Sequence, residues 1–347
     1  MLPLLNSAFK PGTAVEVVER FEDSDFRNIA RAELFYFSGR AKECCEIAES
    51  YLEDEAIELR LSACILYGYS NLSLGNSAAA RRGLEGIQKC MKLVKREGAS
   101  KEVQAVCVLA GYAGVVLLHL PTERIPSLEG YCGMLPEGLR LFAVYVMAHQ
   151  MYLNGEYWSA YGMCKAALLM TNDVYPISMI YIRCMMAMCR INRKDMQESQ
   201  SEFMKGWNLA KMDNFIESFI EHHGLLRGLV EACIRKNDPD GYRKITDGVL
   251  FFSRGWMVIH NNETKKKVTN ELSTMEFSIA MLAGEGWTNK EISAHLGISV
   301  NTVKHYLTDI FGGVLLSSAI VFLYLAFSSG IIKAEKSREG GNESAEK

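Results

Sequence analysis

Apolar residues recur with helical spacing through most of the chain, from about residue 20 to residue 250. Ala, Leu, Met, Glu, Lys and Arg dominate this region, and proline is nearly absent. No alternation of apolar and polar residues persists as it would along a half-buried strand. The pattern therefore predicts an all-α fold of amphipathic helices joined by short turns.

A unit recurs within this region: an apolar helix, a tight turn, and a second helix with a small residue near its start. The turn positions are Gly39, Gly75, Gly155 and Lys194, and the small residues that follow them are Cys44, Ala80, Ala160 and Ser199. The interval between Gly75 and Gly155 leaves room for an intermediate turn at Leu120–Pro121, and Asn237 marks a final one. Spacings near 35–40 residues resemble degenerate tetratricopeptide-like repeats, in which short side chains let paired helices approach closely. An irregular all-α domain is the alternative.

Two further stretches bear on the class of protein. The apolar run from Ala105 to Leu118 is too short to span a membrane, so we expect a buried helix there. The N-terminal residues lack the basic region and apolar core of a signal peptide, so we expect the bulk of the chain in the cytoplasm.

The adjacent histidines His222 and His223 point about 100° apart on a helix, which favours a solvated helix end over a metal site.

The pattern changes after "NNETKKKVTN", a polar stretch that we interpret as a linker. Three short helices can be marked in "ELSTMEFSIAMLAGEGWTNKEISAHLGISVNTVKHYLTDIF". Ser273 with Glu276, and Thr288 with Glu291, have the spacing of capping boxes. Gly297 stands where the second helix should end in a left-handed residue. Short helices joined by a glycine-containing turn indicate a helix-turn-helix.

The third helix separates its side chains into two faces. The apolar face comprises Val300, Val303, Leu307 and Ile310, and the polar face comprises Asn301, Lys304, His305 and Thr308. We expect the apolar face to pack on Phe277, Leu282, Ile292, Leu296 and Ile298. Since the DNA major groove admits one α-helix, the polar face is then free to contact bases. Lys290, near the start of the second helix, is placed to contact the phosphate backbone.

These residues resemble the LuxR-type DNA-binding domain. The matching positions are Leu272, Glu276, Asn289–Ile292, Ala294, Leu296, Ser299 and Asn301–Lys304. A helical-repeat region ahead of such a domain is similar to the large LuxR-type regulators of the MalT kind, without their P-loop ATPase. The resemblance implies double-stranded DNA as a partner, and it leaves a homodimer open. The residues predicted to bind DNA are Lys290, Ser299, Asn301, Thr302, Val303, Lys304, His305 and Thr308.

The sequence departs from that family at its C-terminal side. An uncharged segment, 312–332, begins where the family's fourth helix is expected. It is long enough to cross a hydrocarbon core of about 30 Å as a helix. We therefore expect a membrane span, which would anchor the protein in the cell membrane by its C-terminus and leave its larger N-terminal part in the cytoplasm. A buried C-terminal helix and a frameshifted C-terminus in a soluble cytoplasmic regulator are the alternatives.

Composition narrows the remaining classes. The net charge of -3 excludes a generally basic nucleic-acid coat protein but not a local DNA-binding face. The ten cysteines show no zinc-binding spacing, so we interpret them as small buried residues of a reducing compartment. The sequence contains neither GxxxxGK[ST] nor GxSxG, and no catalytic cluster stands out. We expect no enzyme, no cofactor and no metal.

The sequence thus predicts five segments. They are a helical-repeat domain at 1–253 that binds a protein or small-molecule effector, a linker at 254–271, a LuxR-type helix-turn-helix lacking the fourth helix at 272–311, a transmembrane helix at 312–332 and a polar tail at 333–347. The predicted function is a membrane-anchored transcriptional regulator. The rival is a membrane-associated helical-repeat scaffold whose truncated helix-turn-helix does not bind DNA.

Overall fold

The computed structural model describes residues 1–119, 125–264 and 272–314. Within these ranges all regular secondary structure is helical and there are no β-strands, which confirms the all-α prediction. The first ten helices are α1 (Ala14–Glu19), α2 (Ser24–Phe37), α3 (Ala41–Ala48), α4 (Ile57–Ser73), α5 (Ser77–Glu97), α6 (Lys101–Val116), α7 (Glu137–Leu153), α8 (Tyr157–Met170), α9 (Pro176–Ile191) and α10 (Met196–Ala210). Short 3₁₀ segments lie at Glu49–Tyr51 (η1) and Glu129–Met134 (η2).

Four tight turns join the successive pairs α2–α3, α4–α5, α7–α8 and α9–α10. Each turn has one residue at positive φ, and these residues are Gly39, Gly75, Gly155 and Lys194. In each turn this residue donates its N–H to the carbonyl three residues earlier, and the next residue donates to the carbonyl five residues earlier. This is the Schellman motif, which satisfies carbonyls at the end of the first helix of each pair.

The small residue after each turn lies in the contact between the paired helices. Cys44, Ala80, Ala160 and Ser199 are all at most 1% exposed. The four turns and their buried small residues are consistent with the predicted helical-repeat array. The interval between Gly75 and Gly155 differs from the expected extra helix pair. Between α5 and α7, its described residues form one helix, α6, and the short η2. The expected turn at Leu120–Pro121 lies outside the described residues.

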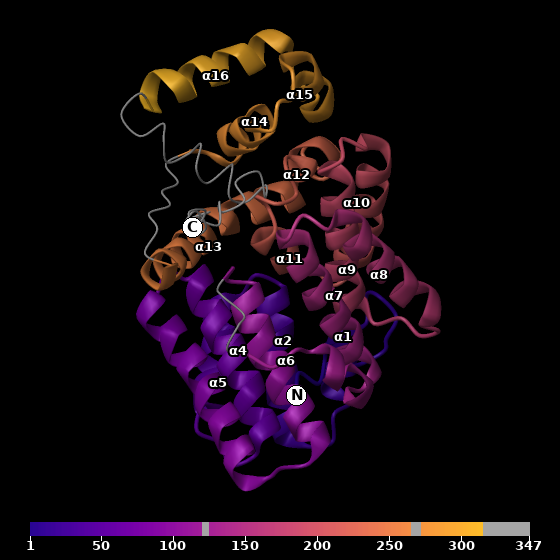
Figure 1. The fold of residues 1–347 in the computed structure, drawn as a ribbon, viewed down its shortest axis with the longest axis vertical. Helices are drawn as coiled ribbons and strands as arrows, with labels where there is room; N and C mark the ends of the chain where they lie inside the picture. Colours follow the sequence, from indigo (N-terminus) through magenta and orange to yellow (C-terminus); the bar gives the residue numbers. More distant parts are fainter. Residues whose placement is uncertain (120–124, 265–271, 315–347) are drawn as a thin grey trace, which may run out of the picture.

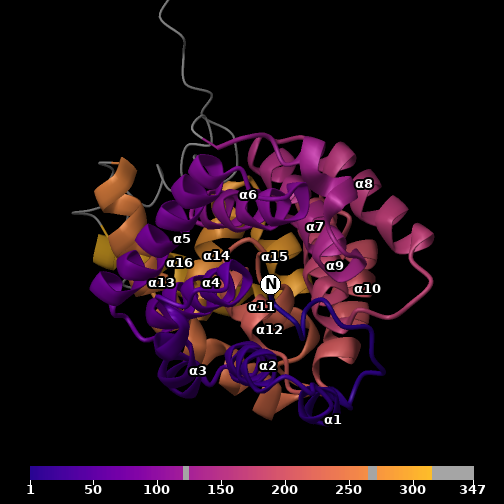
Figure 2. The same cartoon turned by 90° about the horizontal axis from the view of Figure 1, so that it is seen from below.

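The array curves around segments of its own chain. Seen from below, the paired helices surround the N-terminus and α11 (Glu217–Glu221) (Figure 2). The backbone N–H groups of Leu4 and Leu5 donate to the buried carboxyl of Glu33 on α2 at 2.8 and 2.9 Å. On the same inner side, Ile216 donates its N–H to the carbonyl of Phe37. The concave surface typical of such arrays is therefore occupied by residues 1–9 and α11.

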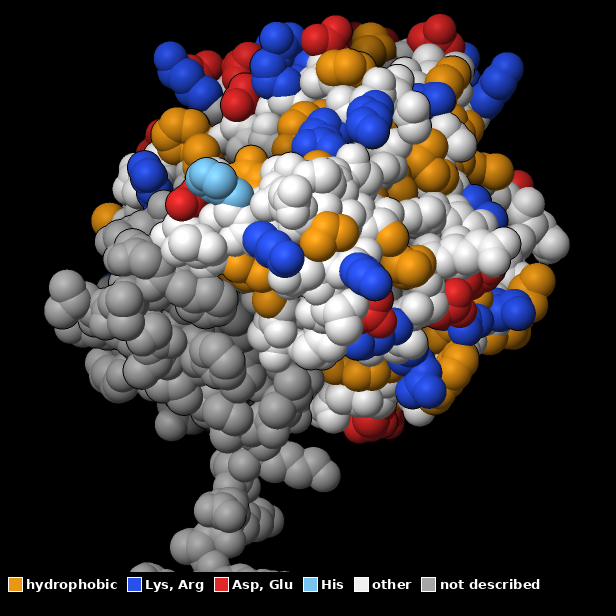
Figure 3. All heavy atoms as spheres, turned by 90° about the horizontal axis from the view of Figure 1, so that it is seen from above, with side chains coloured by type: hydrophobic (Ala, Val, Ile, Leu, Met, Phe, Trp, Pro, Cys, Tyr) orange, Lys and Arg blue, Asp and Glu red, His pale blue; other side chains and the backbone are white. Residues whose placement is uncertain are grey.

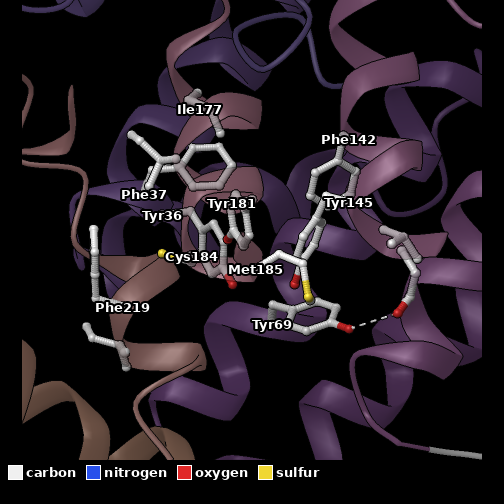
Figure 4. Close-up of a cluster of buried hydrophobic side chains, with 14 of the residues drawn as sticks. Tyr36, Phe37, Tyr69, Phe142, Tyr145, Ile177, Tyr181, Cys184, Met185 and Phe219 are labelled. Atoms are coloured by element: carbon white, nitrogen blue, oxygen red, sulfur yellow. Dashed lines mark hydrogen bonds between the residues drawn. The ribbon is translucent and has the colours of Figure 1, made fainter. Parts of the chain in front are cut away.

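An aromatic cluster fixes this arrangement (Figure 4). Rings from α2, α7 and α9 meet edge to face, with Phe37 and Phe142 each contacting Tyr181. Tyr145 lies 4.9 Å from Tyr181, measured between ring centroids. Such pairs stabilise a core beyond their buried area by roughly 0.5–1.5 kcal/mol each. The cluster therefore joins the first and second halves of the array around α11.

The cysteines and the apolar run behave as expected. All ten cysteines lie within the described residues and are free, and eight of them are buried. Burial raises the pKa of the half-buried Cys45 to about 11, so its thiol stays protonated at neutral pH. The apolar run from Ala105 to Leu118, for which a buried helix was expected, forms most of α6. Ala105, Leu109 and Ala110 in this helix are fully buried.

The C-terminal helices stack on one end of the array (Figure 1). They follow α12 (Leu229–Cys233) and the long α13 (Pro239–Thr264), between which Asn237 lies in the expected turn. The helix α13 runs back to contact α4 and α5. It contains buried Trp256 and Ile259, so the first part of the expected linker at 254–271 is packed helix instead. Residues 265–271 lie outside the described residues.

The helix-turn-helix comprises α14 (Thr274–Gly284), α15 (Asn289–Leu296) and α16 (Val300–Val314). The last of these continues through Gly312 and Gly313. In the part of the chain that is described, no helix is both long and apolar enough to cross a membrane. The predicted span at 312–332 lies outside the described residues from position 315 onward.

Candidate nucleic-acid interface

Local hydrogen bonds set the helix ends of the helix-turn-helix. Both predicted capping boxes are present: the side chains of Ser273 and Thr288 accept from the backbone N–H of Glu276 and Glu291, whose carboxylates accept in return. Gly297 ends α15 at φ 63°, the left-handed conformation expected for it. These caps make the helix boundaries a property of the local sequence.

The apolar faces of the three helices form a small core. Leu282, Ile292, Leu296, Val303 and Ile310 are at most 4% exposed. Val303 is fully buried, so its side chain cannot reach a base edge. The prediction of Val303 as a DNA contact is therefore wrong for the side chain, because the same residue lies on the apolar face that holds α16 in place.

The outer face of α16 carries the other predicted residues. Asn301, Thr302, Lys304, His305 and Thr308 are all exposed. Ser299 precedes the helix, and its hydroxyl accepts from the N–H of Thr302 at 3.0 Å. Figure 1 shows α16 on the side of the molecule that faces away from the array. The array therefore leaves the outer face of α16 uncovered.

Charges on this face are nearly balanced. His305 Nδ1 lies 2.7 Å from a carboxylate oxygen of Asp309, one turn along α16. Asp309 was not among the predicted residues, although the i, i+4 spacing of a histidine and an aspartate on one helix is its sequence signal. Lys290 is exposed at the second position of α15. Figure 3 shows basic side chains spread over this end of the molecule with acidic ones among them.

The helix-turn-helix is docked on the array through buried polar contacts. Arg227, which precedes α12, forms an ion pair with Glu285 at the end of α14, and both side chains are less than 10% exposed. The backbone carbonyl of Arg227 also accepts from Nε2 of the buried His295 at 2.9 Å. Lys194, in the fourth repeat turn, donates to the carbonyl of Gly286 at 3.2 Å. The sequence reasoning identified none of these contacts.

The paired histidines are not a solvated helix end, so that prediction is wrong. His222 and His223 are each 2% exposed. Nδ1 of His222 donates to the carbonyl of Ser218 at 2.6 Å, and Nε2 of His223 lies 2.8 Å from Glu231. They are buried because α11 fills the centre of the array. Among the described residues, no three His, Cys, Asp or Glu side chains are grouped as a metal site requires.

Comparison with known families agrees with this geometry. Residues 270–312 match the model of bacterial regulatory proteins of the luxR family. The match covers α14, α15 and most of α16, and it identifies a LuxR-type helix-turn-helix at this place. No curated protein and no solved structure matches the chain. The presence of a LuxR-type domain supports a role for the chain as a DNA-binding transcription regulator.

Proposed function

We propose that this protein regulates transcription by inserting α16 into the major groove of double-stranded DNA. The observation that carries the proposal is the sorting of α16: Val303 and Ile310 are buried and Val300 and Leu307 are half-buried, while the polar residues on the other face are exposed. In this role Asn301, Lys304, His305 and Thr308 contact base edges or phosphates. Ser299, Thr302 and Lys290 contact the backbone near the helix N-termini.

We further propose that the helical region, residues 1–253, senses an effector and passes its state to the helix-turn-helix. Support comes from the buried Arg227–Glu285 pair and the His295 contact, which link the two parts directly. A rigid link of this kind lets a change in one part alter the position of the other. Anchoring in the membrane through residues 312–332 belongs to the same proposal and rests on the apolar sequence of that segment alone.

DNA binding is tested by fluorescence anisotropy of the full-length protein with a pool of random-sequence duplexes at increasing salt. The proposal expects binding that weakens steeply as salt rises, because phosphate contacts release counterions. Sequencing of the retained duplexes should then yield an enriched motif. Absence of any binding at low salt would favour the rival function, a helical-repeat scaffold that does not bind DNA. Carbonate extraction of membranes tests the anchor separately, and release of the protein would contradict it.

A further inference from the structure

A cavity of about 90 Å³ lies between the array and the helix-turn-helix. Its array walls come from α4, the end of α6, α7, α11 and α13, and its remaining wall comes from Leu272, Thr274 and Phe277 at the start of the helix-turn-helix. Most of the lining is apolar or aromatic, including Trp256 and Phe252 of α13. The helix-turn-helix thus completes a cavity that the array alone would leave open on one side.

Four histidines line this cavity, and the rings of three of them, His119, His149 and His222, lie close together, whereas the fourth, His223, bonds to Glu231. The ring of His149 lies 5.7 Å from that of His119 and 5.5 Å from that of His222, measured between centroids. Burial lowers the pKa of His119 to about 3 and that of His222 to about 4, and it holds the pKa of His149 well below its usual range. All three rings are therefore neutral at pH 7, and each has one N–H donor and one acceptor nitrogen.

A chain of hydrogen bonds decides which nitrogen of His149 carries the proton. A carbonyl can only accept, so Nδ1 of His222 donates to Ser218 and its Nε2 is an acceptor. Nε2 therefore accepts from the hydroxyl of Tyr145 at 2.6 Å. The oxygen of Tyr145 is then left to accept from Nδ1 of His149, 3.2 Å away. It follows that Nε2 of His149 is an acceptor without a proton.

This acceptor is buried and has no hydrogen-bond partner among the described residues. An unsatisfied polar atom in a buried site costs about 1–3 kcal/mol. The nitrogen has almost no accessible surface, so a ligand in the cavity reaches it only when the His149 side chain shifts toward the ligand. A ligand that donates one hydrogen bond there would remove the cost, whereas an anion or a second acceptor would not. The aromatic walls favour a flat apolar body. An apolar cavity of about 150 Å³ holds benzene, so this smaller one limits the buried part of a ligand to about one ring.

We propose that this cavity is the effector site, and that its ligand is a small uncharged aromatic molecule with one hydroxyl or N–H donor directed at His149. The inference rests on the proposed sensing role and names the class of effector. Because Thr274 and Phe277 form part of the wall, ligand binding and docking of the helix-turn-helix are coupled, and the ligand stabilises the docked arrangement.

The test compares phenol with toluene, which has nearly the same shape but no donor. Ligand-detected NMR titrations of the full-length protein give the ratio of the two dissociation constants without any use of DNA. We expect His149→Phe to reduce the preference for phenol by about tenfold. The control Lys165→Phe, at an exposed position of α8 outside the cavity, should leave the ratio unaltered. Ser253→Phe, which fills the cavity from α13, should abolish the binding of both probes.

Hydrogen exchange with and without phenol tests the coupling, and amides of α14 should exchange more slowly when phenol is bound. If phenol does not bind, or if its preference over toluene survives in His149→Phe, the site assignment is overturned. Binding that persists in Ser253→Phe would place the probe elsewhere and also overturn it. Each of these failures leaves the DNA-binding proposal standing, because the anisotropy measurement does not depend on a ligand.

Discussion

Lys194 adopts a backbone conformation that the equivalent turns give to glycine. Its φ is 58°, and its N–H and that of Asp195 make the same two turn hydrogen bonds as Gly39, Gly75 and Gly155 with their neighbours. A left-handed residue with a side chain costs about 1–2 kcal/mol. At this one turn the side chain has a use, because its ammonium group reaches the helix-turn-helix at Gly286 and lies 5.5 Å from the Trp287 ring.

The cost of that conformation can be measured at Gly75, where an added Cβ would meet nothing within 4 Å. We expect Gly75→Ala to lower the free energy of unfolding by about 1 kcal/mol, because only backbone strain is introduced. The matched control is Gly162→Ala in the exposed face of α8, where space is equally open but φ is not positive. It should raise stability by about 0.5–1 kcal/mol. Equal effects of the two changes in urea denaturation would refute the turn argument.

At the scale of the element, α11 shows how a short helix can organise a larger array. It carries the buried Glu217 and the partly buried Glu221, which accept hydrogen bonds from side chains of other helices. The hydroxyl of Ser73 donates to Glu217 at 2.8 Å, and those of Tyr36 and Tyr181 donate to Glu221. Burial raises the pKa of Glu217 to about 8 and that of Glu221 to about 7. At neutral pH Glu217 is therefore mostly protonated and Glu221 is partly protonated, and both lie at the centre of the fold.

These shifts make stability depend on pH with a defined sign. Between the unfolded pKa of 4.5 and the folded pKa of about 8, the folded state binds more protons at Glu217 than the unfolded state does. The free energy of unfolding should thus fall as pH rises through this window. Glu217→Gln can still accept from Ser73 and has no proton to lose. We expect its urea midpoint to exceed that of the wild type at pH 8 by more than at pH 5, and the exposed Glu22→Gln to follow the wild type. Parallel curves for Glu217→Gln and the wild type would contradict the assignment.

The elements that sequence could predict are those whose signals are local. Ser273 and Thr288 cap helices through residues three positions away, and the turn glycines act within five. His222 and His223 were misjudged because their burial depends on α11 lying inside a curve formed by distant helices. Val303 shows the same limit at the site, since the apolar periodicity of α16 marks it as core whereas the family motif places it beside the recognition residues.

For the whole molecule, the central feature is that the helix-turn-helix is attached to the array with its outer face uncovered. The attachment joins residues far apart in the chain, and no local sequence pattern predicts the ion pair between Arg227 and Glu285. Because both side chains are buried, each charge needs compensation by its partner in the ion pair. Burial raises the pKa of Glu285, and the neighbouring Arg227 guanidinium opposes that rise.

The attachment can be tested by a double-mutant cycle on this pair. Arg227→Met and Glu285→Met should each weaken docking by about 3–5 kcal/mol, because each leaves a buried charge without its partner. The docking free energy lost in the double variant should be clearly smaller than the sum of the losses in the two single variants. Hydrogen exchange at the amides of α14 and α15 provides the measurement. Additive effects would show that the two residues act independently and that the ion pair does not hold the domains together.

The most direct test of the account is the salt dependence of DNA binding by Lys304→Ala in the full-length protein. Lys304 is exposed on the outer face of α16, so its loss should weaken binding by about 1–3 kcal/mol if it contacts a base, or reduce the salt slope by about one if it contacts a phosphate. Lys165, which is also exposed and lies on α8, provides the control Lys165→Ala, which should match the wild type in affinity and slope. If Lys304→Ala binds DNA with the affinity and salt slope of the wild type, α16 is not the recognition helix and the account fails.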